Sequence, residues 1–283
     1  MIKTIITDVD GVIVGDKTGV NFPLPNEIVI QKLREIRKRN IPVVLCTGKF
    51  SFAIEEIIIR AELDNPHITD GGALIYNPLR NQIIKQHIID KNLAKKIVQL
   101  CIENNIYVEV YTSKDYFAQK NQVNKLTDKR IIILQKEHKI VDSLTDLISD
   151  IDTIKILAFI KDESHKSQIE NLLKPFTNDI NTIWSTVTFM LPAMAKLITV
   201  KGVSKKHASE EVMRNLNISF DDVLGIGDLP ADWNFMNLCK YTATVGDIDQ
   251  ELRKKVKSKG EKNYLLAPSV DKNGILDIIN YFI

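Results

Sequence analysis

The sequence predicts an α/β fold: a doubly wound, mostly parallel sheet of Rossmann-like type, with an α+β domain inserted into it. Three observations support this prediction. An isoleucine-rich run at residues 4–7 stops at a carboxylate, as a buried strand does. Strand-like and helix-like segments alternate up to residue 76, which favours a parallel sheet. Several strand-like segments then follow with few helices, so we expect core residues 1–79 and 192–283 to flank an inserted domain at 80–191.

The composition is that of an ordinary globular protein. Its 283 residues suffice for one large or two modest domains. The 38 basic and 36 acidic side chains nearly balance, so no overall field favours nucleic acid or an anionic membrane as partner. The three cysteines are odd in number and lack metal-site spacing, and no run approaches the roughly 18 apolar residues of a membrane helix. We therefore expect a reduced, soluble protein in the cytoplasm.

The first part of the chain supplies alternating strands and helices. Pro23 and Pro25 keep the segment after the first strand out of a helix, and Asn26 can cap the helix that follows. The expected elements are a strand ending before Asp8, a loop at 15–26, a helix from Asn26, a strand at 41–46, a helix at 51–63, and strand-like segments at 67–69 and 70–76.

The remaining elements divide between the inserted domain and the returning core. In the inserted domain we expect strands at 83–89, 106–111, 131–135, 153–160 and 183–190, with helices at 91–104 and 164–176. In the returning core we expect a helix opened by residues 202–206, a strand at 223–228, short strands near 243–245 and 264–267, and a last helix at 274–282.

Two carboxylates, Asp8 and Asp10, follow the first strand, where open α/β sheets place their ligand sites. Gly11 permits a sharp turn, so that both side chains can converge. Carboxylates that close repel each other unless a cation, a proton or a reacting group separates them. The pattern indicates a divalent metal, a covalent phosphoryl intermediate or both, with a plain polar turn as the alternative. A calcium loop is excluded because Val12 and Gly19 stand where it needs oxygen ligands.

Two later strands also end in polar candidates. Thr47-Gly48 closes the strand at 41–46, and Asp228 closes the strand at 223–228, with Asp232 close behind. Each feature is weak alone, because strands often end in such residues for reasons of turn geometry. Their meaning depends on whether the sheet brings these strand ends together.

Four segments of the chain belong together: Asp8-Val9-Asp10-Gly11-Val12, Thr47-Gly48, Lys201-Gly202-Val203-Ser204-Lys205 and Gly227-Asp228-Leu229-Pro230-Ala231-Asp232. Taken in this order, they resemble the four motifs of the haloacid dehalogenase-like (HAD) phosphohydrolases. In that family the lysine of the third motif directly follows a small polar residue, which favours Lys205 over Lys201. The inserted domain looks like the cap of subclass IIB, the Cof-type sugar phosphatases, and Asn273-Gly274-Ile275 is similar to a further family segment.

The resemblance implies a phosphatase that depends on Mg²⁺ and acts on a small phosphorylated metabolite such as a sugar phosphate, through an aspartyl-phosphate. Asp8 would be the nucleophile, and Asp10 the general acid and base. Thr47, Gly48 and Lys205 would bind the phosphoryl group. The implied metal ligands are Asp8, the Asp10 backbone carbonyl and Asp228, with Asp232 supporting them.

Some positions depart from the family pattern. Ala231 stands where asparagine is usual, Lys49 where arginine is common, and Asp70-Gly71 where Asn-Gly is usual. None removes a primary catalytic group. A sugar phosphomutase of the same fold is one alternative, and a catalytically weak metabolite-binding or regulatory protein is another, which Ala231 favours. A dehalogenase is disfavoured because Asp10 and Asp228 are both present. We expect a monomer or a homodimer.

Overall fold

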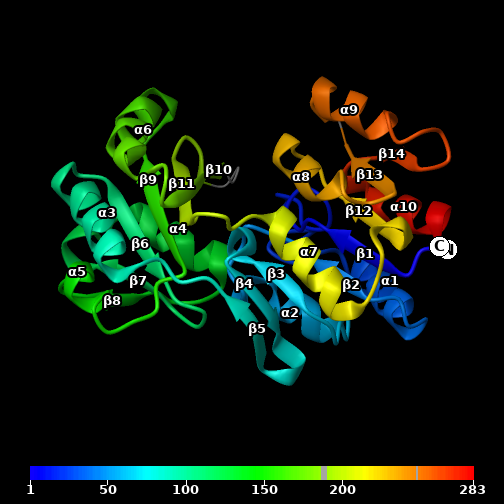
Figure 1. Cartoon of the computed structure of the whole chain (residues 1–283), viewed down its shortest axis with the longest axis horizontal. Helices are drawn as coiled ribbons and strands as arrows, with labels where there is room; N and C mark the ends of the chain where they lie inside the picture. The colour runs from blue at the N-terminus through cyan, green and yellow to red at the C-terminus, as the bar shows by residue number, and fades with distance from the viewer. Residues whose placement is uncertain (186–189, 247) are drawn as a thin grey trace. The chain divides into compact units, whose positions relative to one another are not determined.

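The computed structural model describes residues 1–185, 190–246 and 248–283 and consists of two compact units (Figure 1). The core unit comprises Met1–Lys49, Ile54–Ile84 and Lys205–Ile283. The inserted unit comprises Phe50–Ala53 and Lys85–Ser204. Each unit has its own sheet, so each is described by itself.

The core unit is built on a five-stranded parallel sheet with the strand order β14-β13-β12-β1-β2. From β1 the chain moves outward to β2 on one side, and β12, β13 and β14 follow one another on the other side. This order confirms the predicted doubly wound fold. The switch point, where the direction of strand order reverses, lies between the neighbouring strands β1 and β12. The strands are β1 (Thr4–Thr7), β2 (Val43–Leu45), β12 (Val223–Ile226), β13 (Tyr241–Val245) and β14 (Tyr264–Ala267).

Helices cover this sheet because its strands are apolar on both sides. Every residue of β1, β2 and β12 is buried, as in parallel sheets that are covered on two faces. The helices α7, α8 and α9 share one apolar cluster with Ile6 and Val44, while α1 and α10 contact each other and the outer strands. The helices are α1 (Glu27–Lys38), α2 (Phe52–Arg60), α7 (Lys205–Leu216), α8 (Trp233–Met236), α9 (Gln250–Lys257) and α10 (Gly274–Phe282).

A small antiparallel sheet extends the core unit beyond β2. It contains β3 (His67–Thr69), β4 (Leu74–Asn77) and β5 (Gln82–Gln86). A single parallel bridge between Cys46 and Ile68 joins it to the end of β2. The third strand therefore continues the parallel order for one bridge only, and the chain then turns back at Asp70–Gly72.

The inserted unit has a six-stranded sheet with the order β10-β11-β9-β6-β7-β8. All its pairs are antiparallel except β7 with β8, which confirms an α+β unit. Helices α3, α5 and α6 contribute to its apolar cluster. The elements are α3 (Lys91–Glu103), β6 (Tyr107–Tyr111), β7 (Tyr116–Gln119), α4 (Lys125–Leu134), β8 (Lys139–Val141), α5 (Leu144–Leu147), β9 (Lys155–Ile160), α6 (Lys166–Leu173), β10 (Ile180–Ser185) and β11 (Met194–Val200).

Two predicted strands of the inserted unit need comment. The strand predicted at 131–135 is wrong, because Ile131–Leu134 is the last part of helix α4. Asn124 and Thr127 form a capping box at the start of that helix, which outweighs the β-branched run. The strand predicted at 183–190 overlaps β10 at residues 183–185, and residues 186–189 lie outside the described part.

The inserted unit extends further along the chain than the predicted domain at 80–191. Strand β11 was not predicted, yet it pairs with β10 from Ile180↔Val200 to Ser185↔Ala195 and also with β9. Because a strand belongs to the sheet whose hydrogen bonds it shares, residues up to Ser204 group with the inserted unit. The compact unit also starts at Lys85 rather than at residue 80.

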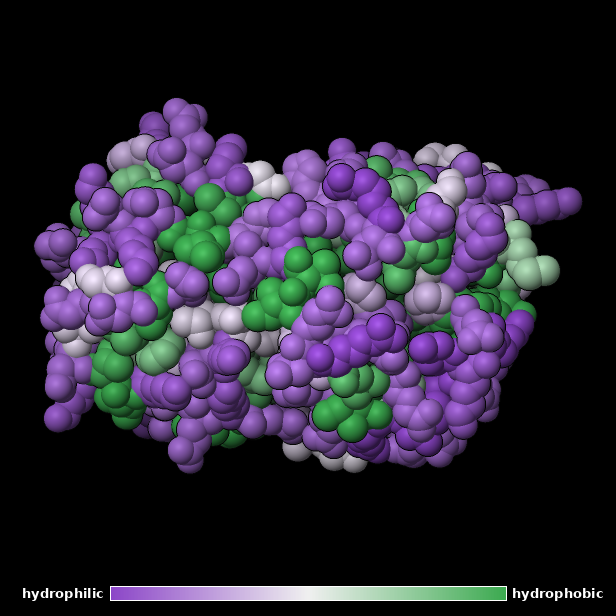
Figure 2. Space-filling view, turned by 60° about the horizontal axis from the view of Figure 1, so that its bottom comes forward, coloured by the Kyte–Doolittle hydropathy of each residue, from purple (hydrophilic) through white to green (hydrophobic). Residues whose placement is uncertain are grey.

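The surface shown in Figure 2 is mostly hydrophilic, with hydrophobic residues in separate small groups. Such scattered groups are normal on a folded domain. Within the described ranges, no helix has the length and apolar character that crossing a bilayer requires.

Candidate active site

The candidate site lies at the carboxyl ends of β1, β2 and β12 in the core unit. Asp8 directly follows β1, and its backbone N–H donates to the carbonyl of Ile226 at 2.9 Å. The side chain is buried, with 5% of the residue exposed. Thr47 follows β2, whose end is tied to β1 by the hydrogen bond from Cys46 N to Thr7 O at 2.8 Å. The sheet thus brings three of the predicted strand ends to one edge.

Gly11 allows Asp228 to approach the turn after Asp8. Its φ is +76°, and a Cβ built at this position would lie 2.0 Å from Asp228 Oδ2. The turn closes when Gly11 N donates to Val14 O at 2.8 Å. Any larger residue would therefore displace Asp228, and the positive φ would strain it. Both reasons explain why this position of the turn is a glycine.

Lys205, the first residue of α7, makes the central contact of the site. Its Nζ lies 2.9 Å from Asp8 Oδ1 and 2.7 Å from Asp232 Oδ1. The other candidate, Lys201, belongs to the inserted unit, where its Nζ donates to Thr177 O at 2.9 Å. Of these two lysines, only Lys205 lies beside Asp8.

Asp232 holds the loop that follows β12. Its Oδ2 accepts hydrogen bonds from the backbone N–H groups of Asp228 at 3.3 Å and Leu229 at 3.1 Å. Its Oδ1 accepts the hydrogen bond from Lys205. Both oxygens are therefore engaged within the protein, which suits the supporting role expected from the sequence.

The carboxylates outnumber the positive charges at their centre. Ligand oxygens of Asp8, Asp228 and Asp232 all lie within 4.8 Å of one another. Burial, and then the charge of Asp232, raise the pKa of Asp8 well above its usual value. The same two causes raise the pKa of Asp228 to about 7. Burial alone would lower the pKa of Lys205, but the carboxylates of Asp8 and Asp232 outweigh it and raise that pKa.

This excess of negative charge fits a divalent cation. Asp228 Oδ1 is buried and has no hydrogen-bond partner among the described residues. A cation bound there would relieve the repulsion that raises the carboxyl pKa values, and carboxylate oxygens are the ligands that hard divalent cations prefer. Asp8 and Asp228 are the side chains that could hold it, because both oxygens of Asp232 are already engaged.

Asp10 faces Lys49, a residue for which the sequence alone predicts no role. Its carboxylate pairs with Lys49 Nζ at 2.9 Å and is not part of the group of three carboxylates. The Lys49 side chain is 8% exposed, whereas that of Asp10 is 47% exposed. The position directly after Thr47-Gly48 was the available signal, since a basic residue is common there in the family pattern.

The loops after β2 and β3 are tied together behind this pair. Thr47 is buried, and its Oγ1 accepts a hydrogen bond from Lys49 N at 3.0 Å. Asp70 N donates to Lys49 O at 2.8 Å, and Asp70 Oδ2 accepts from Thr69 Oγ1 at 2.9 Å. Gly48, also predicted to bind phosphate, is half-buried between them. The loop after β2, which carries Thr47, Gly48 and Lys49, is thus hydrogen-bonded to the loop after β3.

Comparison with known proteins identifies the family. The model for haloacid dehalogenase-like hydrolases matches residues 5–279. A Mycoplasma genitalium protein named as a phosphatase is 22% identical over 249 residues, which cover 85% of this chain and 86% of that protein. The structure of a haloacid dehalogenase-like hydrolase from Bacteroides thetaiotaomicron shares 17% identity over 100% of both chains, with a TM-score of 0.84. That of a HAD subclass IIB sugar phosphatase shares 18% identity over 99% of this chain and 98% of its own, with a TM-score of 0.77. The chain therefore belongs to the haloacid dehalogenase-like hydrolases, as its four sequence segments predict, and is an enzyme of that family.

Proposed function

We propose that this hydrolase is a Mg²⁺-dependent phosphatase that acts on a small phosphorylated metabolite, in particular a sugar phosphate. The observation that carries the proposal is the contact of Lys205 Nζ with Asp8 Oδ1 at 2.9 Å inside a buried group of carboxylates. A positive side chain beside a nucleophilic carboxylate can balance charge on the transferred phosphoryl group. The substrate class is inferred from the subclass IIB sugar phosphatase that shares the fold.

In the first step, an oxygen of Asp8 attacks phosphorus and the bond from phosphorus to the ester oxygen breaks. Asp10 gives a proton to the leaving alcohol, and Asp8 becomes an aspartyl-phosphate. The Lys205 ammonium and the hydroxyl of Thr47, with the backbone at Gly48, would hold the other phosphoryl oxygens. Lys49, at 2.9 Å from Asp10, would keep that carboxyl group in place between the two steps.

In the second step, a water molecule gives a proton to Asp10 and attacks the phosphorus of the aspartyl-phosphate. The bond from phosphorus to the Asp8 oxygen breaks, which releases phosphate and restores both aspartates. Asp8, the backbone carbonyl of Asp10 and Asp228 would hold Mg²⁺, with Asp232 orienting the loop behind them. When bound, the cation would supply positive charge that balances the buried carboxylates.

The test is phosphate release from a panel of sugar phosphates and nucleotides, with Mg²⁺ and with EDTA. We expect release that requires Mg²⁺ and favours sugar phosphates. Absence of release across the panel, in protein shown to bind Mg²⁺, would contradict the phosphatase proposal. A bisphosphorylated sugar in the same panel separates a phosphomutase, because a mutase would keep the phosphate on the sugar.

A further inference from the structure

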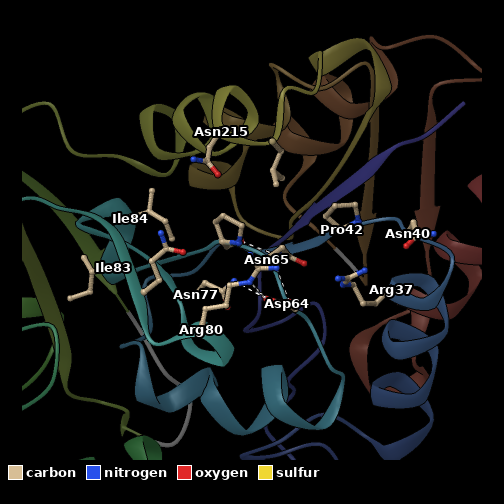
Figure 3. A pocket seen from close by; sticks show the side chains of 13 residues that line it. Arg37, Asn40, Pro42, Asp64, Asn65, Asn77, Arg80, Ile83, Ile84 and Asn215 are labelled. Carbon is tan, nitrogen blue, oxygen red and sulfur yellow. Dashed lines mark hydrogen bonds and ion pairs between the residues drawn. The ribbon is translucent and has the colours of Figure 1, made fainter.

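The core unit contains a cavity of about 410 Å³ at the amino ends of strands whose carboxyl ends carry the candidate active site. Pro42 and Pro66, which line it, come just before β2 and β3. Asn215 lines it from the carboxyl-terminal end of α7 (Figure 3). Lys205 begins the same helix, and 12 helical residues span about 18 Å. The cavity is therefore separate from the group of carboxylates around Asp8.

The wall of this cavity is built from paired groups. Asp64 accepts hydrogen bonds from Arg80 Nε at 2.7 Å, Arg80 Nη2 at 2.9 Å and Asn77 Nδ2 at 3.0 Å. The hydrogen bonds from Arg80, and then from Asn77, lower the pKa of Asp64 to about 2, so it stays ionised. Asn65 Nδ2 donates to the carbonyls of Val43 and Pro66 at 3.1 and 3.0 Å. These bonds give the wall a defined shape without a ligand.

Two amide oxygens in the same wall lack a hydrogen-bond partner among the described residues, Asn65 Oδ1 and Asn77 Oδ1. Both residues are buried, at 4% and 3% exposed. Their amide nitrogens are committed to carbonyl or carboxylate acceptors, so the amides cannot be turned to satisfy the oxygens. Each of these oxygens has less than 1 Å² of exposed surface, so both lie behind the wall and are not open to the cavity. Recognition of a bound molecule therefore falls to the polar side chains that line the cavity itself.

The rim of the cavity offers further polar groups. Arg37 is half-buried at the end of α1 and lines the cavity, and its charge contributes, after the hydrogen bonds from Arg80 and Asn77, to the lowered pKa of Asp64. In Figure 3, Arg37 and Arg80 lie on opposite sides of Asp64 and Asn65. The lining holds two guanidinium groups, of Arg37 and Arg80, and one carboxylate, of Asp64, so its net charge is positive. Within the described ranges, the amides of Asn40, Gln82 and Asn215 have no side-chain partner.

We propose that this cavity binds a small anion that carries several hydroxyl groups, such as a sugar acid or a sugar phosphate. A guanidinium group binds carboxylate or phosphate through two parallel hydrogen bonds, which suits the position of Arg37. Hydroxyl groups both donate and accept, as do the side-chain amides of Asn40, Gln82 and Asn215. The cavity volume falls in the range of small-molecule sites.

The first test is isothermal titration calorimetry of the full chain with gluconate, which carries one negative charge, several hydroxyl groups and no phosphate. We expect one saturable site, with acetate and glucose each binding at least about tenfold more weakly because each lacks half of the recognised groups. Arg37→Gln should weaken gluconate binding about tenfold or more. Arg39→Gln removes the same charge from an exposed neighbour outside the cavity and should leave the affinity unchanged.

The proposal is overturned if gluconate shows no saturable binding at millimolar concentration, if acetate binds equally well, or if Arg37→Gln has no effect. Gln82→Ala, at an exposed position, is the second variant in case Arg37→Gln does not fold. It should weaken gluconate severalfold, and an unchanged affinity would count against hydroxyl recognition. Thermal unfolding of each variant shows that the fold is retained.

A competition experiment identifies the anionic group. In the Asp8→Asn chain, which we expect not to consume phosphate esters, glucose 6-phosphate is titrated against bound gluconate. Displacement that Arg37→Gln weakens supports a phosphorylated ligand. Gluconate binding without displacement supports a sugar acid. Because the readout is loss of bound gluconate, binding of the ester near Asp8 does not affect it, and the result does not depend on the proposed phosphatase activity.

Discussion

Each of the two units buries a group of charged side chains, and the groups differ in how completely their charges are paired. In the inserted unit, Glu109 accepts hydrogen bonds from Tyr107 Oη at 2.8 Å, from Tyr111 Oη and from Arg130 Nε at 3.1 Å. Arg130 also donates to Tyr111 Oη at 2.6 Å. In the core unit, a single lysine faces Asp8 and Asp232, and Asp228 Oδ1 has no partner in the part of the chain that the structure describes.

The difference separates a structural group from a functional one. Glu109 and Arg130 balance one negative against one positive charge, and burial raises the pKa of Tyr111 so that its hydroxyl remains a donor. The carboxylates around Lys205 do not balance, and their raised pKa values show that the folded chain penalises their ionised form. Burial is common to both groups. The imbalance of charge is what indicates a site for a cation and a phosphoryl group.

The largest expected effect comes from Asp8→Asn. Phosphate release should fall by at least about 10⁴-fold, because an amide cannot form the aspartyl-phosphate. The free energy of unfolding in EDTA should stay the same or increase, because the change removes a carboxylate that burial and Asp232 disfavour. Phosphate assays and chemical denaturation measure the two quantities.

Asp16→Asn is the matched control, since Asp16 is exposed in the loop after β1. It should leave both activity and stability unchanged. Substantial turnover by Asp8→Asn would remove Asp8 as nucleophile. A clear loss of stability in that variant would show instead that the group around Lys205 is as structural as the one around Glu109.

Glu109→Gln should produce the second largest effect, this time on stability. The substitution leaves the Arg130 guanidinium buried without its counter-charge, which destabilises folded proteins by about 3–5 kcal/mol. Chemical denaturation measures the loss. Glu163→Gln, which removes an exposed partner of the partly exposed Lys166 in the same unit, is the control and should leave the denaturation midpoint unchanged. An equally small effect of Glu109→Gln would show that the balanced pair does not stabilise the inserted unit.

His67 sharpens the comparison, because it is a buried titratable group that is fully paired only when neutral. Its Nδ1 accepts from Leu45 N at 3.2 Å, and its Nε2 donates to Leu63 O at 3.0 Å. Burial lowers the pKa of His67 from its ordinary 6.5 to about 4. Between these values the unfolded chain binds a proton that the folded chain does not, so stability from this group is complete above pH 6.5 and declines as the pH falls toward 4.

The expected result is a pH-dependent difference between two proteins. From pH 7 to pH 5, the free energy of unfolding should fall by about 2 kcal/mol more in the wild-type chain than in His67→Gln. Denaturation curves at the two pH values measure it, and every other titrating group is common to both proteins. Parallel pH profiles for the two proteins would show that His67 can be protonated within the fold.

The predictable parts of the fold were those with local signals. Apolar runs that stop at Asp8, Thr47 and Asp228 predict strands and their ends, and the sheet brings all three ends together at β1, β2 and β12. Helix α4 was mispredicted because Ile131–Ile133 has strand character on its own, and its capping box lies seven residues upstream. Strand β11 was missed because its evidence is its pairing with β9, more than thirty residues earlier in the chain.

In the candidate site, too, the predictable residues are those with a local signal in the sequence. The family pattern indicates Lys205, and the structure places its Nζ against Asp8. The sequence could not predict that Lys49 faces Asp10, because the direction of its side chain depends on how the loop after β2 is tied to Asp70. Contacts set by two loops at once have no signature in either loop alone.

The smallest expected effect tests that contact. Lys49→Met should lower kcat about tenfold, because Asp10 loses the charge-assisted hydrogen bond that holds its carboxylate. Lys49→Arg keeps the charge and should retain most of the activity. Lys3→Met is the matched control, since Lys3 pairs with Asp222 at 2.7 Å at the opposite end of β1. Equal activity in Lys49→Met and Lys3→Met would show that the reaction does not depend on the Lys49–Asp10 contact. A loss confined to Lys49→Met would show that the reaction depends on two kinds of charged group: the unbalanced carboxylates around Asp8, and the balanced Lys49–Asp10 pair beside them.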